Sequence, residues 1–286
     1  MPTVRDIVRK TTDFFTEKGI GSARLDSELL IASALGWERL QVFLKFDYPL
    51  TEDELEKCRE LVRRRTKGEP VAYILGEKGF YNHTFKVGPA VLIPRPETEM
   101  LVDAAVAHEG RRIVDLGCGS GCIGLSILRE WADAGRENVS LDLVDLSEDA
   151  MAIARENAER LGVIDRCAFH VGDAGEIQLE QSAFDVVVAN PPYIDPTDPK
   201  VEPAVKAFEP SSALFAGGPG DGGILEIVRW AKTAKALVAP GGLVLFEIGD
   251  GQGEASISTF KEVGFSNVKL ARDLSDRERM IVARPQ

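Results

Sequence analysis

The segment Asn190-Pro191-Pro192-Tyr193 carries groups that suit alkylation of a planar nitrogen. It directly follows the apolar run 184–189, and two successive prolines end a strand or a helix. An amide or exocyclic NH₂ is a poor nucleophile because its lone pair is delocalised, so a site that methylates it must accept both N–H groups. The side-chain oxygen of Asn190 and the carbonyl of Pro191 can be those acceptors, and Tyr193 can stack on a planar group. The alternative is a strand-ending turn in which Tyr193 fills a gap in the core.

A glycine-rich stretch lies upstream, between a predicted strand and a predicted helix. Glycine permits positive φ and a close approach of a ligand to the backbone, and the start of the helix offers free N–H groups. A tight turn without a ligand also needs glycine, and the spacing leaves the class of nucleotide open. The residues that we expect to contact a cofactor here are Gly117, Cys118, Gly119, Ser120 and Gly121.

Two aspartates end the next two predicted strands. Asp145 closes the strand at 140–145, where a carboxylate can accept hydrogen bonds from both hydroxyls of a ribose. The alternative is that Asp145 caps the helix that follows it, a role that Ser147 could also take. Asp173 follows a third strand and could face the edge of an adenine, although a solvated loop aspartate fits the spacing equally well.

Short apolar strands that alternate with helical segments run from about residue 112 to the C-terminus. This order predicts a doubly wound parallel sheet, whose ligand site lies beyond the carboxyl ends of the strands. Apolar residues at three- and four-residue steps before residue 65 predict a small helical domain. We expect Asp26 and Thr51 to be N-caps in this domain, and the spacing of Thr51 and Glu54 predicts a capping box. The short alternating runs between Gly68 and Ile93 predict a β-hairpin between the two domains.

Composition and charge narrow the classes of function. The chain has 286 residues and a formal net charge of −12, which disfavours non-specific binding to a phosphate backbone and favours a protein or small-molecule substrate. No apolar run approaches the length of about 20 residues that spans a bilayer, and the N-terminus lacks the apolar region of a signal peptide, so we expect a cytoplasmic protein with no membrane partner. The four cysteines, at 58, 118, 122 and 167, lack the spacing of a disulfide framework or a zinc site, and we expect no metal.

The basic cluster near residue 65 is expected to be the solvated end of a helix, where cations complement the helix dipole. The alternative is a contact with an acidic or RNA-bearing partner. The members of the cluster are Arg63, Arg64, Arg65 and Lys67.

Five motifs together resemble one family. They are "IPRPETE", "DLGCGSG", "VDLS", "ANPPYI" and "FEPSSAL", and they follow a helical N-terminal segment. The chain resembles, over nearly its whole length, the HemK/PrmC family of protein-(glutamine-N5) methyltransferases that act on peptide chain release factors. The "NPPY" motif alone is shared with adenine and other amino-methyltransferases.

The resemblance implies a fold and a reaction. The fold is a helical substrate-docking domain over 1–75, a β-hairpin linker over 76–93 and a seven-stranded class I, Rossmann-like methyltransferase domain over 94–286. The reaction uses S-adenosylmethionine, leaves S-adenosylhomocysteine and methylates the glutamine of a Gly-Gly-Gln motif in class I release factors, without a stable nucleic-acid partner. One alternative is an adenine-N6 or guanine-N2 methyltransferase that acts on nucleic acid, and a second is a catalytically silent cofactor-binding module.

The resemblance also implies roles for individual residues. Gly117 to Gly121 and Asp145 match the cofactor loop and the ribose carboxylate, and Asn190 to Tyr193 match the glutamine pocket. In that pocket Asn190, Pro191 and Tyr193 are expected to be catalytic, Asn190 also to touch the cofactor, and Pro192 to bind substrate.

Two further positions are Ala174 and Arg95. The residue after Asp173 often is an aromatic that covers adenine, but here it is Ala174. Arg95 is expected to bind a substrate carbonyl or the methionine carboxylate, and the alternative is that it pairs with Glu97 or Glu99.

Overall fold

The computed structural model of the chain describes residues 1–199, 201–217 and 223–285. The chain folds into two compact units, Met1–Glu77 and Lys78–Gln286. Within the described ranges, every helix is too short or too polar to cross a membrane.

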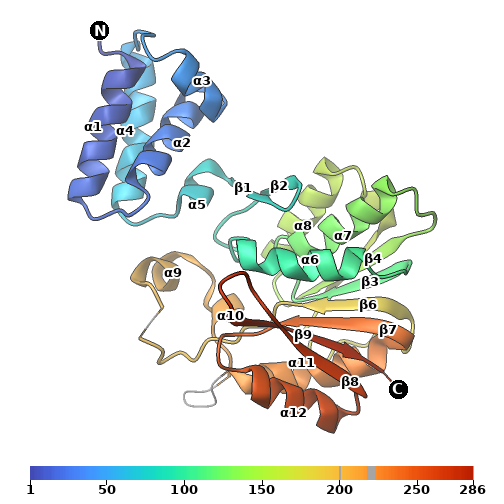
Figure 1. The fold of residues 1–286 in the computed structure, drawn as a ribbon. Helices are drawn as coiled ribbons and strands as arrows, with labels where there is room; N and C mark the ends of the chain where they lie inside the picture. The colour runs from blue at the N-terminus through green and yellow to red at the C-terminus, as the bar shows by residue number, and fades with distance from the viewer. Residues whose placement is uncertain (200, 218–222, 286) are drawn as a thin grey trace. The chain divides into compact units, whose positions relative to one another are not determined.

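The smaller unit is built of five helices before the start of β1, as the sequence predicts (Figure 1). Buried apolar side chains such as Val4, Ile31 and Leu50 form one part of its core, and Phe15 and Leu30 belong to another. The helices are α1 (Val4–Glu17), α2 (Ala23–Leu35), α3 (Arg39–Leu44), α4 (Glu52–Thr66) and α5 (Val71–Leu75).

Of the two predicted N-caps in this unit, Thr51 is confirmed and Asp26 is not. The capping box is confirmed, since Thr51 Oγ1 accepts a hydrogen bond from Glu54 N at 3.3 Å and the Glu54 carboxylate accepts one from Thr51 N at 2.8 Å. The prediction for Asp26 is wrong, because Ser22 occupies the N-cap position of α2. Asp26 lies in the first turn, where it accepts a hydrogen bond from Arg65 Nε of α4 at 2.8 Å. Asp26 therefore forms a buried ion pair between α2 and α4, although its local sequence predicts a helix cap.

The arginines of the basic cluster pair with acids of the same unit. Arg63 bonds to Glu60 at 2.6 Å, and Arg64 bonds to Glu69 at 2.5 Å. Together with the Arg65–Asp26 pair, these contacts give each arginine an acidic partner within the unit. Arg63 is exposed, as expected for the solvated end of a helix, but the expectation is wrong for Arg65, because its pair with Asp26 is largely buried.

The larger unit contains a seven-stranded sheet in the order β5-β4-β3-β6-β7-β9-β8. The doubly wound, seven-stranded prediction is confirmed, but a fully parallel sheet is wrong because β9 runs antiparallel to both β7 and β8. Only residues 273–277 separate β8 from β9, and so short a connection can form a hairpin but not a parallel crossover. The strands are β3 (Arg112–Leu116), β4 (Ser140–Asp145), β5 (Cys167–Val171), β6 (Phe184–Ala189), β7 (Val238–Glu247), β8 (Asn267–Arg272) and β9 (Glu278–Arg284).

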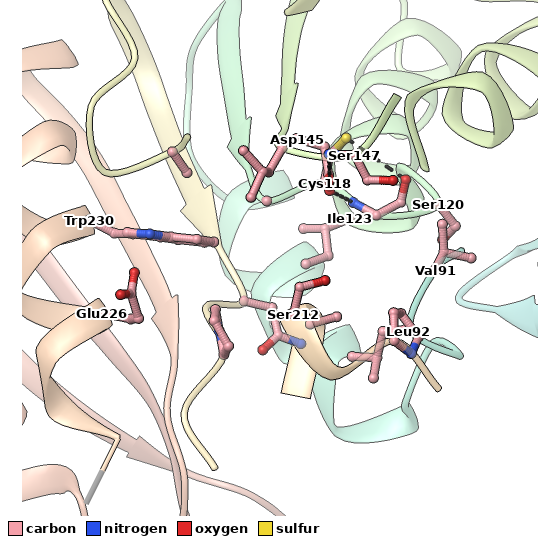
Figure 2. A pocket seen from close by; sticks show the side chains of 18 of the residues that line it. Val91, Leu92, Cys118, Ser120, Ile123, Asp145, Ser147, Ser212, Glu226 and Trp230 are labelled. Atoms are coloured by element: carbon pink, nitrogen blue, oxygen red, sulfur yellow. Dashed lines mark hydrogen bonds between the residues drawn. The ribbon is translucent and has the colours of Figure 1, made fainter. Parts of the chain in front are cut away.

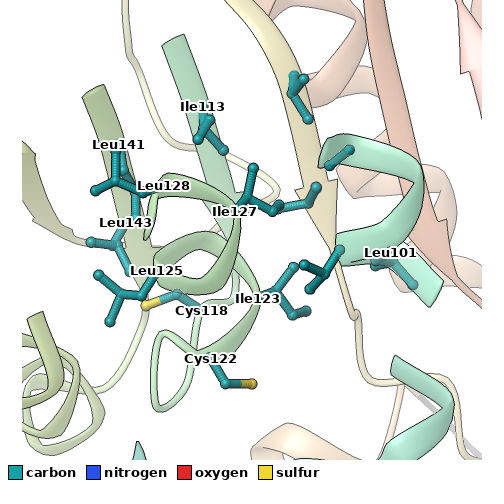
Figure 3. Close-up of a cluster of buried hydrophobic side chains, with 14 of the residues drawn as sticks. Leu101, Ile113, Cys118, Cys122, Ile123, Leu125, Ile127, Leu128, Leu141 and Leu143 are labelled. Atoms are coloured by element: carbon teal, nitrogen blue, oxygen red, sulfur yellow. The ribbon is translucent and has the colours of Figure 1, made fainter. Parts of the chain in front are cut away.

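Helices cover both faces of this sheet. One buried cluster joins the sheet to α6, α7 and α8, and Figure 3 shows part of it, with Leu125 and Leu128 beside Leu141 and Leu143. A second cluster packs α11 and α12 on the other face, with Ile227 and Phe260 among its members. The long helices are α6 (Glu99–Val106), α7 (Cys122–Asp133), α8 (Glu148–Arg160), α11 (Ile224–Leu237) and α12 (Gly253–Val263). The short ones are η1 (Pro96–Thr98), η2 (Ile164–Arg166), α9 (Pro203–Phe208) and α10 (Ser211–Leu214).

A hairpin of β1 (Glu77–Phe80) and β2 (His83–Lys86) precedes the sheet. Phe80 and Phe85 are buried in the cluster with α6, α7 and α8. Asn157 of α8 accepts a hydrogen bond from Lys86 N at 2.7 Å and donates to the carbonyls of Lys86 and Ser120 at 3.0 and 2.9 Å. One buried amide therefore ties the hairpin and the glycine-rich loop to the same helix.

Candidate active site

A cavity of about 330 Å³ opens at the carboxyl ends of β3, β4 and β6 (Figure 2). The chain runs from β3 outward through β4 to β5 and then returns to the other side of β3 as β6. This reversal is the place where open α/β sheets bind ligands. The predicted residues that line the cavity are Arg95, Gly117, Cys118, Gly119, Ser120, Asp145, Asp173, Ala174, Asn190 and Pro192.

The glycine-rich loop follows β3 with left-handed backbone at several positions. A Cβ at Gly117, whose φ is 71°, would lie 2.4 Å from the ring of Trp230, so no other residue fits there without displacing the indole. Gly119, whose φ is 53°, has open space where a Cβ would stand. The loop therefore presents bare backbone to the cavity, and the start of α7 follows directly at Cys122.

Asp145 ends β4 at the edge of the cavity. Its Oδ2 accepts a hydrogen bond from Gly119 N at 2.8 Å and its Oδ1 accepts one from Ser147 N at 2.9 Å. The cap of α8 is Ser147, whose Oγ accepts a hydrogen bond from Ala150 N at 3.1 Å. Burial raises the pKa of Asp145, although bonds from the N–H groups of Ser147 and Gly119 act in the opposite direction. Each carboxylate oxygen can accept a further hydrogen bond, so the group retains capacity for two hydroxyls.

Asp173 lies in the loop after β5 and belongs to an ion-pair network. Its Oδ2 accepts a hydrogen bond from Arg229 Nη2 at 2.7 Å, and its Oδ1 accepts one from Gly175 N at 2.8 Å. Burial raises the pKa of Asp173, but the hydrogen bonds from Arg229 and Gly175 outweigh that effect and the pKa is lowered. Arg229 belongs to α11, so this contact places that helix beside the cavity.

Asn190 follows β6 and lies between two cavities. It lines the first one together with Pro192, and it lines a neighbouring cavity of about 450 Å³ together with Pro191 and Tyr193. Within the described part of the chain, the side chain of Asn190 makes no hydrogen bond, so its oxygen is available as an acceptor. A group held in one cavity can therefore meet a group held in the other at this residue.

Tyr193 is fixed by the buried carboxylate of Glu247, a residue that belongs to none of the sequence motifs. Tyr193 Oη donates to Glu247 Oε1 at 2.9 Å, and Thr98 Oγ1 donates to Glu247 Oε2 at 2.6 Å. Glu247 ends β7 and is 1% exposed. Burial raises the pKa of Glu247 against the lowering effect of these two bonds. The sequence signal that could have indicated Glu247 is its place directly after the apolar run 243–246, at the end of a strand.

Arg95 pairs with a residue that the sequence analysis did not consider. Its Nη2 donates to Glu209 Oε1 at 2.5 Å, and Ile93 N donates to Glu209 Oε2 at 3.1 Å. The expected alternative of a pair with Glu97 or Glu99 is wrong. Pro96 starts a new helical turn, so Arg95 keeps extended backbone and its side chain leaves the helix that carries those acids. The segments "IPRPETE" and "FEPSSAL" thus meet in one ion pair beside the site.

Comparison with known proteins gives matches along the whole chain. A PrmC N-terminal domain model matches residues 6–76, and a methyltransferase domain model matches residues 107–215. Curated relatives named release factor glutamine methyltransferase include one from Geobacter sulfurreducens, 37% identical with 99% of this chain and 96% of the relative covered. The relative from Xylella fastidiosa is 38% identical over 91% and 93%, and that from Escherichia coli is 34% identical over 92% of each chain. Among solved structures, a SAM-dependent O-methyltransferase from Thermotoga maritima is 13% identical with a TM-score of 0.48, covering 68% of this chain and 67% of that one.

Proposed function

The chain belongs to the family of release factor glutamine methyltransferases, and from this premise we propose that it methylates N5 of the glutamine in the Gly-Gly-Gln motif of class I release factors, in the cytoplasm. The observation that carries the proposal is the similarity to the Geobacter sulfurreducens relative, which spans 99% of this chain and 96% of that protein. The enzyme is an S-adenosylmethionine-dependent methyltransferase, and its product is S-adenosylhomocysteine.

The residues of the first cavity fit this cofactor. The open space beside Gly119 is a cradle that any other side chain would fill. Ser120 Oγ is buried beside the cavity and has no hydrogen-bond partner within the described residues. Asp145 is the carboxylate that we assign to the ribose hydroxyls, and Asp173 is the one that we assign to the adenine edge. When bound, S-adenosylmethionine supplies an electrophilic methyl group on a sulfonium.

The second cavity has the groups that an amide substrate needs. We assign the Asn190 side-chain oxygen and the Pro191 carbonyl as acceptors for the two N–H groups of the glutamine, which holds its nitrogen in line for attack. Asn190 is neutral, so it adds no buried negative charge beside a cationic donor, and the amide nitrogen loses its proton after transfer. The bond from Tyr193 to Glu247 holds the aromatic ring in place while the substrate is bound.

The choice between glutamine and adenine must come from surfaces outside the pocket, because Asn190 and Pro191 can hold any planar NH₂ group. We propose that the helical unit Met1–Glu77 docks the release factor. The net charge of −12 supports a protein substrate over a nucleic acid, since an acidic surface gains nothing from the release of counterions.

Radiolabelled methyl transfer to a release factor, to DNA and to RNA, measured side by side, tests the proposal. The full chain is expected to label only the release factor at physiological salt. A chain that begins at Lys78 should bind S-adenosylhomocysteine as tightly as the full chain but label the release factor far more slowly. Label on adenine would contradict the substrate class, and full activity of the shortened chain would contradict the docking role.

A further inference from the structure

Trp230 of α11 forms part of the cavity wall that we assign to the cofactor (Figure 2). Its side chain is packed against the sheet, and the residue is 8% exposed. The outer edge of the indole approaches the glycine-rich loop, because its Cη2 and Cζ3 atoms lie 2.4 and 2.7 Å from the place of a Cβ on Gly117. This close approach puts the edge of an aromatic ring directly beside the backbone of the glycine-rich loop at Gly117.

The part of the cavity beside Trp230 adjoins Asp173, the carboxylate that we assign to the adenine edge. Arg229, the preceding residue, bonds to Asp173, and Trp230 belongs to the same buried cluster as Ala174. Ala174 offers only a methyl group to the cavity. Among the described residues, one other aromatic lines the cavity, Phe215, and it pairs with Ile194, which follows directly after Asn190–Tyr193. The aromatic surface near Asp173 is therefore that of Trp230.

Hydrogen bonding in the core does not explain a tryptophan at this position. The Nε1 atom of Trp230 is buried and has no partner within the described ranges, which costs free energy that a phenylalanine or leucine would not incur. A large ring at the edge of a cavity is instead useful for its area, since a base packs on an aromatic surface without needing a polar contact.

We propose that Trp230 is a cofactor-binding residue whose indole provides the aromatic surface against which the adenine packs, since position 174 holds an alanine. This inference rests on the cofactor part of the proposed function and not on the identity of the methyl acceptor. The competing explanation is that Trp230 only fills the core between α11 and the sheet.

Two ligands separate these explanations in calorimetry. S-adenosylhomocysteine carries the base, and S-ribosylhomocysteine lacks it but keeps the ribose and the amino acid. Trp230→Leu should weaken binding of the first by about 5- to 150-fold, the range for loss of one base–aromatic contact, and change binding of the second less than about twofold. Trp230→Phe should bind the first within about threefold of the unaltered chain, because an aromatic face remains. Equal losses for both ligands, or no loss for either, would overturn the proposal.

Tryptophan fluorescence provides an independent test that does not require S-ribosylhomocysteine to bind. The chain has three tryptophans, and Trp131 is a matched control because it is fully buried, also lacks a partner for Nε1 among the described residues, and does not line the cavity. S-adenosylhomocysteine should change the emission of the unaltered chain and of Trp131→Phe but not that of Trp230→Phe. Persistence of the change in Trp230→Phe would contradict contact with the base.

Both measurements use purified enzyme without a release factor. An error in the assigned methyl acceptor therefore leaves them unaffected. Failure of the unaltered chain to bind S-adenosylhomocysteine would instead contradict the proposed function itself.

Discussion

Replacing Tyr193 with phenylalanine removes the hydroxyl group that ties the segment Asn190–Tyr193 to Glu247. The lost hydroxyl donates to Glu247 at 2.9 Å, and Glu247 is 1% exposed, so water does not readily replace the donor. A hydrogen bond to a buried carboxyl group contributes about 1.5–3 kcal/mol. Because Thr98 still donates to Glu247 at 2.6 Å, we expect the free energy of unfolding to fall by about 1.5–2 kcal/mol, the lower part of that range.

The same change should slow catalysis, because Tyr193 adjoins the two proposed acceptors and a displacement of about 1 Å can cost roughly 100-fold. We expect turnover to fall by about 10- to 100-fold while the affinity for S-adenosylhomocysteine stays within about threefold. Urea unfolding and steady-state methyl transfer measure the two effects. Tyr48→Phe is a matched control, since it removes an exposed bond to Glu54 at 3.2 Å and should change stability by less than about 0.5 kcal/mol.

A double-mutant cycle tests whether the bond itself is responsible. Glu247→Gln alters the acceptor of the same contact, so its effect and that of Tyr193→Phe should not add, with a coupling energy of about 1 kcal/mol or more. Additive effects, or a Tyr193→Phe enzyme with normal stability and turnover, would refute the positioning role of the Glu247 carboxylate.

Three further substitutions have expected outcomes. Asn190→Ala should lower turnover by about two to three orders of magnitude with cofactor affinity within a few-fold, and near-normal turnover would remove Asn190 from the mechanism. Asp145→Ala should weaken S-adenosylhomocysteine binding by about 1.5–3 kcal/mol in calorimetry; unchanged affinity with lost stability would favour a structural role. Burial raises the pKa of Asp115 to about 7 in the folded chain, so its contribution to stability falls as pH rises from about 4 to about 7. Asp115→Asn keeps an acceptor for Gly124 N but cannot titrate. Between about pH 4 and about pH 7 its free energy of unfolding, measured with urea, should therefore decrease by roughly 2–4 kcal/mol less than that of the unaltered chain. The same pH dependence in both proteins would contradict the raised pKa of Asp115.

Much of the site could be predicted because its residues end neighbouring strands. Parallel strands place their carboxyl ends at one edge of a sheet, so the loop after β3, Asp145 after β4 and Asn190 after β6 had to lie near each other once those strands were recognised. Glycines, prolines and apolar runs are local signals, and they do not depend on how distant segments pack.

The supporting contacts could not be predicted in the same way. Arg95 and Glu209 are 114 residues apart, and Thr98 and Glu247 are 149 residues apart. Such pairs form only when packing brings buried polar groups together, and each partner alone resembles an ordinary helix or strand end. Trp230 likewise fits the apolar pattern of an amphipathic helix, and its place beside Gly117 follows from the packing of α11 on the sheet.

The antiparallel β9 was missed for a different reason. The segment 273–277 is short and polar, which is the local signature of a hairpin turn, and it separates two alternating stretches. The preceding alternation of strands and helices favoured a parallel continuation, although a crossover cannot be made with so few residues.

The central claim is that the methyl group is transferred to a glutamine side chain. The most direct test is to incubate the purified chain with S-adenosylmethionine and an unmethylated class I release factor, and to map the modified residue by tandem mass spectrometry. We predict one methyl group on the side-chain nitrogen of the Gly-Gly-Gln glutamine, and with Asn190→Ala at the same exposure a yield lower by about two to three orders of magnitude. A methyl group on another residue, or an unmodified release factor beside a chain that binds S-adenosylhomocysteine, would contradict the claim.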